Sequence, residues 1–81
     1  MITKDSIESA YCFFHQKWNI YSKSVNERQR DDIEYAIGNY ANDMNRELYT
    51  EMSGEKNGFL LEHSTFAEDI YNAIAYLERL L

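Results

Sequence analysis

Cys12 and His15 are the two residues whose types and spacing come closest to a metal-binding or catalytic pair. Three positions apart on a helix, a thiol and an imidazole point to the same side and can reach one metal ion. Zinc sites of this kind need a second Cys/His pair, which this chain lacks, and its other histidine, His63, falls in a predicted loop. We therefore interpret the pair as ordinary residues at the edge of the core. A site shared across a dimer is the alternative.

Catalysis by Cys12 would require His15 as a base, a third group that orients this base, and an oxyanion donor. Two residues on one continuous helix do not supply the remaining groups. The carboxylates scatter over positions expected to be exposed and form no Glu-x-x-His motif of the di-iron type. The glycines are not spaced as in a phosphate-binding loop. We expect a protein that is not an enzyme and has no cofactor, metal ion or small-molecule substrate.

Three stretches of the chain repeat apolar residues at alternating steps of three and four, which places each set on one face of a helix. The first two stripes are Ile7, Tyr11, Phe14, Trp18, Tyr21 and Ile33, Ile37, Tyr40, Met44, Leu48. The third is Phe66, Ile70, Ala73, Leu77, Leu80. The pattern predicts an all-α, three-helix up-down-up bundle with helices at 4–22, 25–53 and 65–81, joined in part by a long loop, 54–64.

The start of the second predicted helix is ambiguous. Residues 24–27 and 31–34 both fit a capping box, and residues 26–32 contain no apolar side chain. That stretch is either a solvated helical turn or the interhelix loop, and we favour the earlier start because no glycine or proline marks a loop there. Gly38, inside this helix, marks either a close helix crossing or a tolerated surface glycine. In the loop, Phe59, Leu60 and Leu61 are expected to fold over one end of the core.

Length and composition indicate one helical domain over residues 1–81. One cysteine excludes an internal disulfide, the first residues do not resemble a signal peptide, and no apolar run approaches the about 20 residues that span a bilayer. We therefore expect a soluble cytoplasmic protein. The net charge of −6 disfavours binding to nucleic acid and to an anionic membrane surface.

Apolar bulk outside the three stripes is the feature that bears most on function. Phe13 and Ile20 form a second stripe on the first helix, and Tyr35 and Tyr49 lie nearly opposite the stripe of the second. Contiguous exposed apolar residues usually mark a binding surface, although a wide core could also enclose them. We predict a non-enzymatic protein that acts by protein–protein interaction through these four residues, either with a partner protein or with itself as a homodimer.

An acidic decoy that imitates nucleic acid is the alternative function. Carboxylates along the second predicted helix would present negative charge to a basic DNA-binding protein, through ordinary electrostatic attraction. The residues concerned are Asp31, Asp32, Glu34, Asp43, Glu47 and Glu51.

Overall fold

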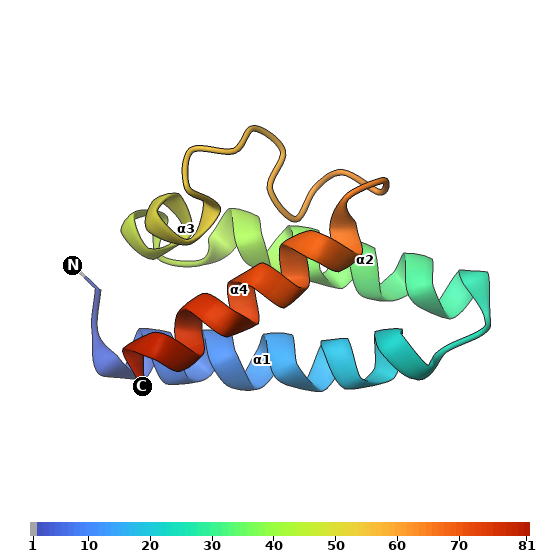
Figure 1. Cartoon of the computed structure of the whole chain (residues 1–81), viewed down its shortest axis with the longest axis horizontal. Helices are drawn as coiled ribbons and strands as arrows, with labels where there is room; N and C mark the ends of the chain where they lie inside the picture. The colour runs from blue at the N-terminus through green and yellow to red at the C-terminus, as the bar shows by residue number, and fades with distance from the viewer. Residues whose placement is uncertain (1) are drawn as a thin grey trace.

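The computed structural model describes residues 2–81, and this part of the chain forms four helices and no strand (Figure 1). These are α1 (Lys4–Lys23), α2 (Glu27–Asp43), α3 (Arg46–Ser53) and α4 (Phe66–Leu80). The all-α class is therefore confirmed. The expected number of helices is wrong, because the single helix predicted over 25–53 is divided into α2 and α3.

The break between α2 and α3 is caused by Asn45. Its side-chain oxygen accepts the N–H of Leu48 at 3.0 Å and so caps a new helix, while Met44 before it has an extended backbone. Asparagine side chains compete in this way with the backbone hydrogen bonds that would continue a helix. The guanidinium of Arg46 donates to the carbonyl of Ala41, near the end of α2. In Figure 1, α3 is seen nearly along its axis, whereas α2 is seen from the side.

The other helix ends lie close to their predicted positions. Thr3 caps α1 by accepting the N–H of Ser6 at 3.1 Å, and Asn26 caps α2 by accepting the N–H of Arg28 at 2.9 Å. Residues 27–32 are therefore a solvated helical turn, and all six are exposed. In Figure 1 this first part of α2 projects beyond the start of α4.

The up-down-up order is also wrong, because α4 runs antiparallel to α1 and in the same general direction as α2 (Figure 1). Tyr11 lies early in α1, and its hydroxyl donates to Glu78, near the end of α4, at 3.0 Å. Tyr21 lies late in α1, and its ring packs on that of Phe66, at the start of α4, with 5.1 Å between the ring centroids. The reason is the connection at residues 54–65. At about 3.3 Å per residue it is long enough to return along the molecule before α4 begins.

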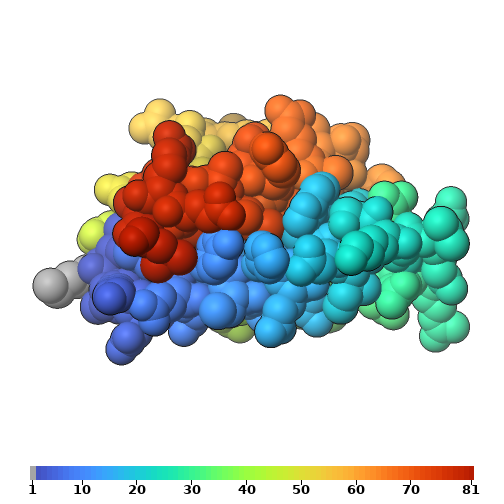
Figure 2. Space-filling model, turned by 60° about the horizontal axis from the view of Figure 1, so that its bottom comes forward, coloured from blue at the N-terminus to red at the C-terminus, as the bar shows by residue number. Residues whose placement is uncertain are grey.

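The core is one cluster of buried side chains from all four helices and the loop. From α1, α2 and α4, it contains Ala10, Phe14, Tyr21, Ile33, Ile37, Ala41, Phe66, Ile70, Ala73, Ile74 and Leu77; α3 and the loop add Leu48, Met52, Phe59 and Leu60. α1 packs against both α2 and α4, and Figure 2 shows α4 lying along α1 on one face of the molecule. Most residues of the predicted stripes belong to this cluster or pack against it, although Leu80 is 44% exposed.

Candidate functional site

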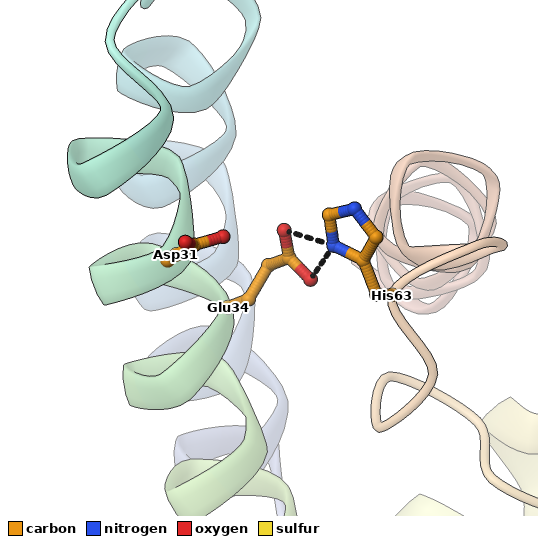
Figure 3. Close-up of side chains that lie close together, drawn as sticks. All are labelled: Asp31, Glu34 and His63. Carbon is orange, nitrogen blue, oxygen red and sulfur yellow. Dashed lines mark hydrogen bonds and ion pairs between the residues drawn. The ribbon is translucent and has the colours of Figure 1, made fainter.

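Asp31, Glu34 and His63 form a cluster of possible ligand groups where the loop passes α2 (Figure 3). Asp31 and Glu34 lie three residues apart on α2 and therefore on the same side of that helix. His63 comes from the loop, and its Nδ1 lies 2.9 and 3.0 Å from the two carboxylate oxygens of Glu34. One ligand atom from each of the three side chains lies within 4.8 Å of the others.

The Glu34 carboxylate is the centre of this cluster. Because a carboxylate only accepts hydrogen bonds, His63 donates to it through Nδ1–H, and the Tyr21 hydroxyl donates to it from α1 at 3.3 Å. The Glu34 side chain is only 14% exposed, whereas that of His63 is 80% exposed. The hydrogen bond to Glu34, together with the charge of that carboxylate, raises the pKa of His63 above its ordinary value. Glu34 thus joins α1, α2 and the loop.

A shallow pocket lies over the cluster. The pocket has a volume of about 260 Å³. It is lined by Tyr21, Glu27, Arg30, Asp31, Glu34 and His63. The guanidinium of Arg30 lies 4.7 Å from the centre of the Tyr21 ring. Three carboxylates and one guanidinium therefore surround this pocket, and this balance of charge favours a cation over an anion.

A groove between α2 and the loop begins at the same carboxylate. Glu34 lines the groove at one side, Gly38 lies on its α2 wall, and Leu61 covers its loop wall. The volume of the groove is about 360 Å³. A Cβ atom at Gly38 would lie 3.4 Å from Leu61 Cδ2, so the glycine marks a close approach of the loop rather than of another helix. Tyr35 and Leu61 are 75% and 52% exposed. The groove thus has exposed apolar side chains on both of its sides.

The loop wall of this groove is held by a buried carboxylate on α4. Asp69 is 1% exposed, and its two oxygens accept the Lys56 ammonium at 2.5 Å and the Leu60 N–H at 3.0 Å. The hydroxyl of Tyr49 also donates to the carbonyl of Phe59 at 2.7 Å. As expected, Phe59 and Leu60 are buried, while Leu61 remains exposed.

The four residues predicted to form an interface lie on three helices and differ in burial. Ile20 on α1 is 44% exposed and Tyr35 on α2 is 75% exposed. Phe13 is half-buried, because its ring stacks on that of Tyr40 with 4.4 Å between the centroids. Tyr49 is half-buried against the core, where its hydroxyl bonds the loop.

Cys12 and His15, the pair considered for a metal ion or for catalysis, are not part of the cluster. Cys12 is exposed, and the His15 ring stacks on that of Tyr11 with 5.5 Å between the ring centroids. Among residues 2–81, no other group of three His, Cys, Asp or Glu side chains brings ligand atoms as close together as Asp31, Glu34 and His63 do. The carboxylates considered for a decoy do not form one row, because Glu47 and Glu51 lie on α3 and the other four on α2.

Sequence reasoning missed both the cluster and Asp69. The spacing of Asp31 and Glu34 is visible in the sequence, but His63 follows 29 residues after Glu34 and is brought there only by the path of the loop. The sequence did contain an indication that Asp69 is buried. It stands three residues after Phe66 and four before Ala73, so it is an acidic residue on a predicted apolar stripe, and such a residue needs a buried partner.

Comparisons with family models, with curated proteins and with solved structures give no match for this chain. Within the described residues, no helix has both the length and the apolar character needed to cross a membrane.

Proposed function

We propose that this protein acts without catalysis, as a protein-interaction module, and that the groove between α2 and the loop is its binding surface. The observation that carries the proposal is the pair Tyr35 and Leu61, two large apolar side chains that are more than half exposed and line one groove. Exposed apolar side chains that gather on a concave surface are typical of binding sites.

The charge of α2 and of the whole chain favours a basic partner. α2 carries five carboxylates and two arginines, and the net charge of the chain is −6. Complementary charge accelerates association and fixes the orientation of a bound segment. The proposed occupant is therefore a segment of another protein that combines apolar side chains with lysine or arginine.

Selection of peptides from a random display library on the immobilised protein tests this proposal. We expect enrichment of sequences that combine apolar and basic residues, with binding that weakens as salt is raised. Tyr35→Asp should abolish the enrichment, and Tyr71→Ala is the matched control, because Tyr71 is a 61% exposed tyrosine on α4. Equal enrichment on Tyr35→Asp and on the native chain would contradict the proposal.

Gly38→Ala is a variant in which we expect binding to weaken without loss of stability. Alanine stabilises a helix interior by about 1 kcal/mol relative to glycine, and the added methyl group would be in ordinary contact with Leu61. The same methyl group fills part of the groove wall. We expect a fold at least as stable as the native one and a weaker affinity for the selected peptides.

Self-association remains a prediction that the same protein preparation can test. Sedimentation equilibrium over a hundredfold range of concentration, at low and high salt, would detect a dimer. Ile20→Asp is the sharper variant for this test, because Phe13→Asp would also break the stack on Tyr40. A salt-insensitive dimer that Ile20→Asp dissociates would favour a homodimer, whereas a monomer at all concentrations would favour the partner segment.

A further inference from the structure

We propose that Asp31, Glu34 and His63 bind a divalent transition-metal ion, for which Zn²⁺ is the appropriate probe. The site is separate from the proposed function, because it concerns an ion held in the pocket beside the groove and not a protein bound in it. It also differs from the Cys12–His15 pair that the sequence brought to attention.

The donor set is the first reason. One imidazole nitrogen and two carboxylate oxygens are ligands that zinc accepts, and three protein ligands with water in the remaining position form an open zinc site. The imidazole distinguishes this cluster from a patch of acidic residues, because a purely carboxylate site would favour Ca²⁺ or Mg²⁺ instead.

The geometry is the second reason. Ligand atoms in a tetrahedral zinc site are about 3.4 Å apart, given bonds of about 2.1 Å. His63 Nδ1 and Glu34 Oε1 are already 2.9 Å apart, and one ligand atom from each of the three side chains lies within 4.8 Å of the others. The Asp31 side chain is exposed, so it can rotate towards an ion held by the other two side chains. The pocket above has room for the ion and its water.

The charge of the pocket is the third reason. Its lining contains three carboxylates, from Glu27, Asp31 and Glu34, and one guanidinium, from Arg30. The guanidinium lies over the Tyr21 ring. A divalent ion would displace the Nδ1 proton of His63, which is released to water, and would join His63 and Glu34 in its place. Binding would therefore fasten the loop to α2 without moving either element far.

Calorimetric titration of Zn²⁺ into tag-free, chelator-treated protein tests the site directly. We expect one ion per chain and a rise in the unfolding temperature, since an ion that binds the folded state alone stabilises it. His63→Ala should abolish this binding, and the variant should fold normally because its side chain is 80% exposed. Glu34→Gln should weaken binding about tenfold or more.

The double variant Cys12→Ser with His15→Ala is the matched control and should bind Zn²⁺ as the native chain does. Co²⁺ provides a second readout, because coordination by Asp31, Glu34 and His63 gives no thiolate-to-cobalt absorption band. The proposal is overturned if the native chain shows no saturable binding or if His63→Ala binds equally well. It is also overturned if binding is lost in the double variant and not in His63→Ala, which would move the ion to Cys12 and His15.

Discussion

At the scale of single residues, the Asp69 carboxylate holds the loop wall of the groove in place. A buried carboxylate is stable only when its oxygens are paired, and here a lysine, a backbone N–H and the Thr65 hydroxyl approach it. The hydrogen bond to Asp69 also raises the pKa of Lys56, which is therefore charged at neutral pH. Because Lys56 and Leu60 both belong to the loop, this one carboxylate determines where the loop wall of the groove lies.

Asp69→Ala should therefore destabilise the protein and release the loop. The Leu60 N–H would be left buried without its acceptor, which costs about 2 kcal/mol of folding free energy. Urea denaturation would measure the loss, and hydrogen exchange at the Leu60 amide would locate it. Glu68→Ala is the matched control, because it removes an exposed carboxylate from the same turn of α4 and leaves the pairing of Asp69 intact, so it should cost little. Native protection of the Leu60 amide in Asp69→Ala would contradict the role given to this carboxylate.

At the scale of elements, the turn at Asn45 separates two helices that the apolar pattern alone would join. The stripe from Ile33 to Leu48 continues across the break, because Leu48 on α3 is buried in the same core cluster as Ile33 on α2. The cap, rather than the hydrophobic pattern, thus sets the direction of α3 and the place from which the loop departs.

Asn45→Ala should lower the stability by about 1 kcal/mol, the usual cost of removing a helix N-cap. Urea denaturation would measure the difference in the free energy of unfolding. Asn72→Ala is the matched control, since Asn72 is an exposed asparagine within α4 and alanine is the better helix former. Equal stability of the Asn45→Ala variant and the native chain would show that the cap does not maintain the break.

Helices could be predicted from this sequence more readily than their arrangement, for a physical reason. The period of apolar residues and the cap at Thr3 act within a few residues, so the position of α1 follows from the sequence. The start of α2 lies near the earlier of its two possible positions, where Asn26 is the cap. The direction of α4 depends on a connection that is held by Asp69. The Glu34–His63 contact depends on that same connection, and no local pattern encodes it.

At the scale of the whole molecule, the aromatic residues replace much of the aliphatic core that so short a chain would otherwise need. Several of them are tyrosines that pack their rings inward. Burial is the largest cause of the raised pKa of Tyr21, Tyr40, Tyr49 and Tyr76, and a hydrogen bond to Glu78 is the largest cause for Tyr11. Ionisation of these phenols is therefore less favourable in the folded chain than in the unfolded one.

The stability of the protein should therefore fall as the pH rises above about 10. A phenol whose pKa is higher in the folded than in the unfolded state keeps its proton to a higher pH when folded. The free energy of unfolding therefore decreases once the pH passes 10.0, the ordinary value. Tyr40→Phe tests this, because burial alone raises the pKa of Tyr40 and phenylalanine would preserve the stack on Phe13. In urea denaturation the variant should match the native chain at pH 8 and lose less stability at pH 11. Tyr35→Phe, which removes a phenol from the surface, is the control, and an identical loss in Tyr40→Phe and the native chain would show that the buried phenol does not contribute.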